Sequence, residues 1–146
     1  MEIRIEQATA LGAELDPLVT EAEADGHLFM RRLRDEWASG SNRFDQRGER
    51  LMVARSADRL VGVGGVNRDP YAQAPDIGRL RHLYVASDVR RRGVGALLVR
   101  SILADARAHF TLICLRTDST EAAAFYRRLG FQPTDADDAT HVMAIA

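Results

Sequence analysis

Residues 81–99, RHLYVASDVRRRGVGALLV, run from an extended apolar segment through a turn with two glycines directly into an apolar helix. The first N–H groups of a helix have no partner inside it, and the helix dipole adds positive charge there. Gly93 and Gly95 let an anion approach the backbone closely, and Arg90, Arg91 and Arg92 add full charges. This arrangement predicts a phosphate or pyrophosphate site at the start of the helix.

Two common phosphate-binding motifs do not fit this stretch. The P-loop needs a Lys-Ser or Lys-Thr pair after its last glycine, and none follows here. The dinucleotide fingerprint needs a third glycine where Leu98 stands, and it lies close to the first strand of its fold. The anion site therefore belongs to another class of protein.

The composition of the chain excludes several classes of protein. The chain has 146 residues, 46% of them hydrophobic, and a formal net charge of -1, which suits one domain spanning 1–146. The near-neutral charge disfavours nucleic-acid binding, and no apolar run approaches the ~20 residues of a membrane span. A single cysteine excludes an internal disulfide, and the histidines lack metal-ligand spacing. The N-terminus lacks a secretory pattern, so we expect a cytoplasmic protein without a metal.

Hydrophobic periodicity predicts a mixed α/β sheet with helices on its faces, in the order β-α-α-β-β-β-α-β-α-β-β. The first helix begins at Asp16 as its N-cap, and Leu28, Phe29, Leu33 and Trp37 share one side of the second. The expected helices cover 16–25, 27–40, 93–108 and 119–130, the last with a start formed by Asp118 and Glu121. The expected strands lie in 2–8, 51–56, 59–66, 79–85, 111–117, 131–134 and 140–146.

Two segments resemble motifs of the GNAT superfamily of acyl-CoA-dependent N-acetyltransferases. The pattern Q/R-x-x-G-x-G/A is matched by Arg90, Gly93 and Gly95. The segment 119–131, STEAAAFYRRLGF, is similar to the family's N-x-x-A-x-x-F-Y-x-x-x-G-F. Its matching residues are Ala122, Phe125, Tyr126, Gly130 and Phe131. Both motifs occur in the family's order and about 35 residues apart, which makes the resemblance specific.

The resemblance implies a single GNAT-like domain with a mostly antiparallel central sheet flanked by helices. It implies acetyl transfer from acetyl-CoA to a primary amine of a small molecule or peptide, in a monomer or homodimer without a metal. Tyr126 would be the general acid, and Phe29 would line the acceptor pocket. The residues implied to bind the donor are Leu83, Tyr84 and Val85 along pantetheine, Arg90, Arg91, Arg92, Gly93, Val94, Gly95 and Ala96 at the pyrophosphate, and Ser119.

The sequence departs from the family pattern at three positions. Ser87 stands where proline is frequent, and Ser119 stands where asparagine is frequent. Arg79 stands where many members carry a glutamate that acts as a base, so the base is left open. By location, the candidates for the base are Glu21, Glu23 and Asp76.

Arg79 and Arg81 lie two residues apart and are expected to share a sheet face. One interpretation is that they bind a carboxylate or phosphate of the acceptor. The other is a structural pair bonded to Asp76 or to a neighbouring loop. Alternation predicts that His82 points away from both arginines, which favours a packed or hydrogen-bonded histidine, with a base as the other interpretation. Cys114 is expected to be a core thiol.

Two other functions compete with catalysis. A non-catalytic acyl-CoA-binding or regulatory module would share the fold, and the missing strand glutamate is its only support. A nucleic-acid binder would use the three arginines, but no aromatic residues are interleaved with them.

Overall fold

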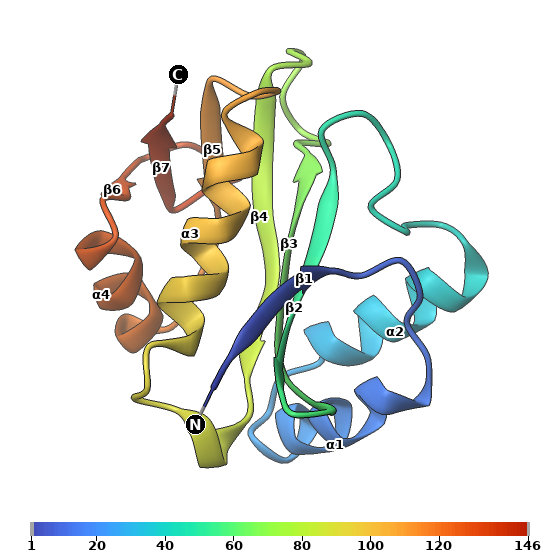
Figure 1. The fold of residues 1–146 in the computed structure, drawn as a ribbon. Coiled ribbons are helices and arrows are strands. Elements are labelled where there is room, and N and C mark those ends of the chain that lie inside the picture. Colours follow the sequence, from blue (N-terminus) through green and yellow to red (C-terminus); the bar gives the residue numbers. More distant parts are fainter. Residues whose placement is uncertain (1, 146) are drawn as a thin grey trace.

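The computed structural model describes residues 2–145, which form seven strands and four α-helices (Figure 1). The last residue of the expected closing strand, Ala146, lies outside the described residues. The strands are β1 (Arg4–Gln7), β2 (Arg50–Ser56), β3 (Arg59–Arg68), β4 (Ile77–Val85), β5 (Leu112–Leu115), β6 (Gln132–Pro133) and β7 (His141–Ala144). The helices are α1 (Asp16–Ala24), α2 (Phe29–Ser39), α3 (Val94–Ala106) and α4 (Thr120–Arg128), with 3-10 turns at Ala13–Leu15 and Ser87–Val89.

All seven strands belong to one sheet, in the order β1-β2-β3-β4-β5-β7-β6. Every neighbouring pair is antiparallel except β4 and β5, which are parallel and are joined by α3. A parallel pair needs a long crossover connection, and the helix supplies it. The expected α/β fold with a mostly antiparallel central sheet and flanking helices is confirmed.

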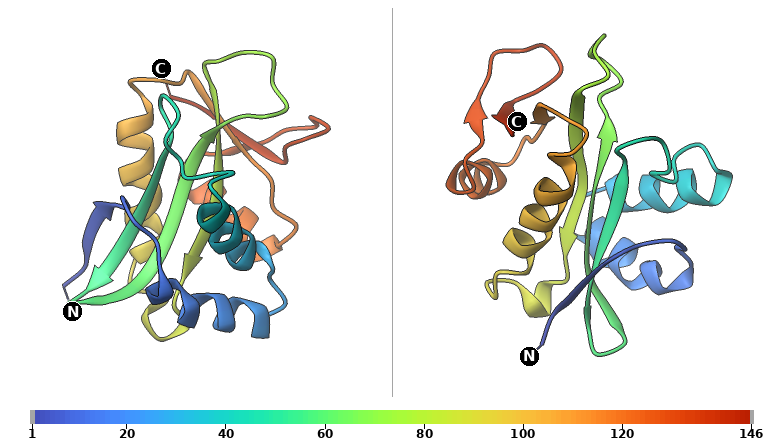
Figure 2. Two further views of the ribbon diagram at one scale, coloured as in Figure 1. Left: turned by 90° about the vertical axis from the view of Figure 1, so that its right-hand side faces the viewer. Right: turned by 45° about the horizontal axis from the view of Figure 1, so that its top comes forward.

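Helices cover both faces of the sheet (Figure 2). Along β3, a side chain at Gly62 or Gly64 would meet Leu98 or Ile102 of α3. A side chain at Gly65 would instead meet Phe44, which follows α2. Because successive strand residues point to opposite faces, α3 packs on one face and the α1–α2 side of the molecule on the other. The glycines of β3 allow both layers to approach the sheet closely.

The register of β4 breaks close to its C-terminal end. Val63 pairs with Tyr84 and Gly65 pairs with Arg81, so one residue of β3 lies opposite two of β4, His82 and Leu83. His82 has φ 60°, in the left-handed region, as expected for an extra residue at a bulge. Its ring packs against Phe44 on the same face as Arg81. The expectation that His82 points away from Arg81 is wrong, because the bulge interrupts the alternation.

The parallel pairing of β4 with β5 is short. It joins Ile77 to Leu112, Gly78 to Ile113 and Arg79 to Cys114. Beyond it β4 continues to Val85, and within residues 2–145 no strand pairs with this part on the β5 side. The two strands therefore separate, and residues 80–85 of β4 face the gap without a neighbouring strand among the described residues.

Helix starts differ from expectation in two places. Asp16 is the first residue of α1, and no side chain of residues 2–145 caps that helix; Leu15 is the N-cap residue. At α4 the cap is Ser119, not Asp118, and its hydroxyl accepts a hydrogen bond from the Ala122 N–H at 3.1 Å. A serine at this position satisfies one of the free N–H groups of the first turn.

The buried side of α2 also differs from expectation. Leu28 precedes the helix and is 60% exposed, while Met30 is fully buried beside Leu33 and Trp37. The spacing of positions 30, 33 and 37 follows the helical period, and Leu28 falls outside it because the helix begins at Phe29. In α3, Val94, Leu98, Ile102 and Ala106 are buried, whereas Leu97 is 40% exposed.

Candidate functional site

The start of α3 has the form of an anion-binding turn. Arg91 and Gly93 have φ angles of 67° and 79°, both left-handed, and Gly93 is the N-cap residue of α3. Within residues 2–145 no side chain caps this helix, and the first bond of its ladder runs from the Leu97 N–H to the Gly93 carbonyl at 3.0 Å. The N–H groups of 94–96 are therefore left for a ligand, as a diphosphate requires.

The two glycines of this turn have different roles. Gly93 has the left-handed φ, and a Cβ there would meet no heavy atom within 4 Å. Gly95 lies in ordinary helix, but a Cβ there would be 3.3 Å from Cζ of Phe125 in α4. Gly93 is thus needed for backbone conformation and Gly95 for space.

Arg90 turns toward α1 and away from the turn that it precedes. Its Nε donates to the Val85 carbonyl at 3.0 Å, and its guanidinium lies 5.2 Å from the ring centre of Tyr84. Its Nη2 is 3.7 Å from carboxylate oxygens of both Glu21 and Asp25. Arg90 therefore ties the end of β4 to α1, while its neighbours Arg91 and Arg92 are exposed.

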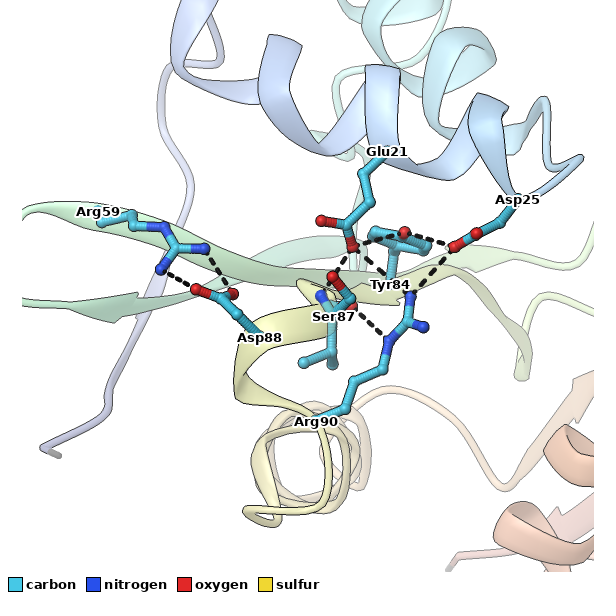
Figure 3. A network of polar contacts seen from close by, with 8 residues as sticks. Glu21, Asp25, Arg59, Tyr84, Ser87, Asp88 and Arg90 are labelled. Atoms are coloured by element: carbon cyan, nitrogen blue, oxygen red, sulfur yellow. Dashed lines mark hydrogen bonds and ion pairs between the residues drawn. The ribbon is translucent and has the colours of Figure 1, made fainter.

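Glu21 connects α1 to the end of β4 (Figure 3). Its Oε1 accepts the Ser87 N–H at 2.7 Å and the Tyr84 hydroxyl at 2.9 Å, and Asp25 Oδ2 lies 3.3 Å from the same hydroxyl. Burial, followed by the hydrogen bond to Glu21, raises the pKa of Tyr84, so the phenol stays protonated and donates. Sequence patterns gave no sign of this contact, which forms across 63 residues of chain.

The other two candidates for the base lie elsewhere. Glu23 pairs with Arg31 at 2.6 Å, and Asp76 accepts from the Thr111 hydroxyl at 2.8 Å. Of the three carboxylates, only Glu21 reaches the end of β4 that leads into the turn.

Arg79 is a structural residue. It is 6% exposed, and its Nε donates to Asp69 at 2.8 Å and its Nη2 to the Asp138 carbonyl at 2.6 Å. The Tyr71 ring lies 4.9 Å from the guanidinium carbon. Of the two interpretations of Arg79, these contacts agree with the structural pair, because its guanidinium is already engaged by the fold. The partner is Asp69 in the neighbouring β3–β4 loop rather than Asp76.

Arg81 and Phe29 remain on the face that α2 covers. Arg81 is partly buried, and its Nη1 donates to Asn67 Oδ1 at 3.3 Å. Phe29 is the first residue of α2, and its ring meets Tyr84 edge-on, with centroids 6.1 Å apart. The two flank the bulged part of β4 from the side opposite α3.

Tyr126 lies in α4 within the apolar cluster that also holds Leu80 and Leu115. It is 9% exposed, and its ring meets the rings of Phe125 and Phe131 edge-on at 5.1 and 5.7 Å. Burial raises its pKa, so the phenol keeps its proton at neutral pH. Burial likewise raises the pKa of the Cys114 thiol to about 11, which agrees with its expected place in the core.

His82 is the buried histidine of the site. It is 7% exposed, and neither ring nitrogen has a hydrogen-bond partner among residues 2–145. Burial, with the positive charges of Arg81 and Arg32, lowers its pKa from 6.5 to about 3. The ring is therefore neutral throughout the physiological range.

Because His82 is buried as a neutral ring, we expect the protein to be less stable in acid. Between pH 6.5 and 3 the unfolded chain binds a proton that the folded chain does not, so stability falls as the pH is lowered. The free energy of unfolding is expected to fall by about 2 to 3 kcal/mol from pH 6.5 to 4.5 on account of His82. Urea unfolding at several pH values measures it, and His82→Phe should remove that part of the slope. Equal slopes in the two proteins would contradict the burial of a neutral ring.

The described chain offers neither a metal cluster nor a membrane helix. Within residues 2–145 no group of three His, Cys, Asp or Glu side chains is placed to hold a metal ion. No helix in that range is both long and apolar enough to cross a bilayer.

Comparison with known proteins identifies the family. Residues 47–133 match the family model described as "Acetyltransferase (GNAT) domain". N-alpha-acetyltransferase RimI of Mycobacterium tuberculosis is 32% identical over 114 residues, which cover 76% of this chain and 70% of that protein. Human N-acetyltransferase 8 is 34% identical over 93 residues, but the match covers 61% of this chain and only 41% of that protein.

A solved structure has the same fold along nearly the whole chain. The crystal structure of a protein from Exiguobacterium sp. 255-15, classed as an acetyltransferase, superposes with a TM-score of 0.88 at 26% identity. The superposition covers 99% of this chain and 94% of that one. The chain spans less than half the length of the two N-acetyltransferase 8 relatives that it matches, in human and rat. With the family match over residues 47–133, these comparisons show that the chain belongs to the GNAT acetyltransferase family.

Proposed function

We propose that the protein transfers the acetyl group of acetyl-CoA to a primary amine of a small molecule or a polypeptide. The observation that carries the proposal is the unpaired edge of β4, which leads directly to the uncapped start of α3. A long ligand with amide groups at one end and a diphosphate at the other would pair its amides with the β4 edge and its diphosphate with the start of α3. Family membership supports the reaction class.

The donor would lie along β4 and end at the turn before α3. The backbone of Leu83, Tyr84 and Val85 would pair with the pantetheine amides as a neighbouring strand does. The backbone of 90–96 would bind the diphosphate, with Arg91 and Arg92 adding charge. Gly95 would leave room beside Phe125. Ser119, whose hydroxyl caps α4, would contact the donor from the helix on the other side of the gap.

The reaction is a direct attack of the amine on the thioester. The amine nitrogen forms a bond to the carbonyl carbon, the carbon–sulfur bond breaks, and one proton passes from nitrogen to sulfur. Tyr126, which stays protonated, would donate to the leaving thiolate. The thiol has an ordinary pKa near 8.5, so this donation assists a leaving group that is already good.

Tyr126→Phe keeps the ring and its packing and removes the proton. We expect kcat to fall about 10- to 100-fold, at the low end of the range for a positioned acid, with little change in acetyl-CoA affinity. Steady-state thiol release measures kcat, and calorimetry measures binding. An unchanged kcat, with chemistry shown to be rate-limiting, would make Tyr126 a packing residue.

The acceptor would approach from the α2 face, past Phe29 and Arg81. The relative RimI is named for acetylation of α-amino groups, so peptides with a free N-terminus are the first acceptors to test. If Arg81 binds the acceptor, the acceptor carries a carboxylate or phosphate near its amine.

The test is thiol release from acetyl-CoA over a panel of amines that includes N-terminal peptides, a polyamine and an amino sugar. Amine-dependent release that yields the N-acetyl product by mass spectrometry supports the proposal. Binding of acetyl-CoA without turnover on any amine would favour the non-catalytic acyl-CoA module instead. Absence of binding would contradict both.

A further inference from the structure

His82 is the extra residue at the β4 bulge. Its φ of 60° lies in the left-handed region, which residues other than glycine adopt uncommonly. Its ring nitrogens are fully buried and, among residues 2–145, unpartnered, which disfavours folding compared with an apolar ring of the same shape. A strained backbone that carries an unpartnered polar ring often marks a functional position.

The surroundings of the ring indicate which ligand it faces. Phe44 packs edge-on at 6.1 Å between centroids, Arg81 and Arg32 are the neighbouring charges, and the backbone of Phe29 lies close to the ring. These groups belong to the face from which the acceptor would enter. The next residue, Leu83, belongs to the segment proposed to hold pantetheine, so the imidazole lies at the junction of the two substrates.

We propose that His82 is the catalytic residue that receives the acceptor amine, with a ring nitrogen that accepts a hydrogen bond from the attacking nitrogen and then takes its proton. This inference rests on the proposed acetyl transfer. As the carbon–nitrogen bond forms, the nitrogen becomes positively charged, and one of its protons passes to the imidazole. The carbon–sulfur bond then breaks, and sulfur receives a proton from Tyr126. Solvent carries the proton of the imidazolium back to the phenolate, which restores both residues.

The charges around the ring favour an acceptor amine that is uncharged. Arg81 and Arg32 oppose a positive charge at this point, so they disfavour binding of the acceptor as an ammonium ion. An uncharged amine keeps the lone pair that attack requires. After attack the nitrogen is more acidic than a free ammonium ion, and it loses its remaining basicity as the carbon–sulfur bond breaks, so its proton can pass to the imidazole.

The acceptor must displace part of the cover over the ring. Phe44 is 3% exposed and fixed in the core, whereas Phe29 is partly exposed at the start of α2. Leu28, beside it, is 60% exposed. The Phe29 side chain is therefore the part of this cover that can move to admit the acceptor.

Two variants test the inference. His82→Phe keeps the ring shape and removes both nitrogens, and His82→Gly relieves the backbone and leaves space for free imidazole. With the best amine of the panel, we expect kcat/KM to fall ~100-fold or more in both variants, at unchanged acetyl-CoA affinity. The midpoint of thermal unfolding of His82→Phe is expected to be equal to or above that of the wild type. Added imidazole is expected to restore part of the activity of His82→Gly alone.

The outcomes separate this inference from the proposed function. Wild-type turnover with equal turnover by His82→Phe would overturn the role of His82 and leave acetyl transfer intact. Loss of activity that follows a loss of folded protein in His82→Phe, with no imidazole rescue of His82→Gly, would make the residue structural and also overturn the inference. If the wild type binds no acetyl-CoA and acetylates no amine, the proposed function fails and the inference fails with it.

Discussion

Gly95→Glu is expected to weaken acetyl-CoA binding ~100-fold or more while the protein stays folded. A carboxylate in the first turn of α3 would occupy the N–H groups that the diphosphate needs. Loss of two hydrogen bonds to a charged group, at about 1.5 to 3 kcal/mol each, corresponds to a loss of this size. The same carboxylate interacts favourably with the helix dipole, so the free energy of unfolding should change little. Titration calorimetry gives the affinity, and circular dichroism gives the fold.

Two matched variants separate charge from size. Gly95→Ala places only a Cβ near the Phe125 ring, 3.3 Å from Cζ, which a small shift of the ring can accommodate. Gly95→Gln has the size of glutamate without its charge. We expect affinity to decrease in the order Ala, Gln, Glu. Wild-type affinity in a folded Gly95→Glu protein would remove the start of α3 from the donor site.

Asp69→Ala is expected to lower the free energy of unfolding by about 3 to 5 kcal/mol. Asp69 and Arg79 form an ion pair whose two side chains are each 7% exposed, with 2.8 Å between Nε and Oδ1. Among the described residues, removal of the carboxylate leaves a buried guanidinium with the Asp138 carbonyl and the Tyr71 ring as its remaining partners. Urea unfolding monitored by tryptophan fluorescence measures the loss.

An exposed ion pair provides the control. Arg59 and Asp88 are 2.6 Å apart but 55% and 58% exposed, so Asp88→Ala is expected to lower the free energy of unfolding far less than Asp69→Ala. The double variant Asp69→Leu with Arg79→Met should recover most of the stability that Asp69→Ala loses, because no charge remains buried. Equal losses in Asp69→Ala and Asp88→Ala would contradict a buried structural pair.

The order of elements followed from the sequence because each helix and strand buries one face, and burial leaves a period in the pattern. The turn before α3 followed from its glycines, whose spacing has a chemical reason. The bulge at His82 could not be predicted, because it is a mismatch between two strands and neither strand carries a mark of it. The expectation that Leu28 shares a side of α2 with Leu33 and Trp37 was wrong for a related reason. The residues that share a side depend on where the helix begins.

The polar contacts of the site also could not be predicted from sequence patterns. Glu21 meets Tyr84 across 63 residues of chain, and Arg79 meets the carbonyl of Asp138 across 59. Such pairs depend on how separate elements pack, which local periodicity does not encode. Arg79 shows the consequence: its charge was visible in the sequence, but the carboxylate that neutralises it was not.

The short pairing of β4 with β5 has a consequence for the order in which ligands bind. Three residue pairs join the two parts of the sheet between β4 and β5, so few backbone hydrogen bonds fix the angle between these parts. The donor, bound along the free edge of β4 and at the start of α3, would add contacts that fix this angle. The acceptor would then bind to a surface that is already ordered. Sequential kinetics, with the donor first and the acceptor second, would follow from this order of events.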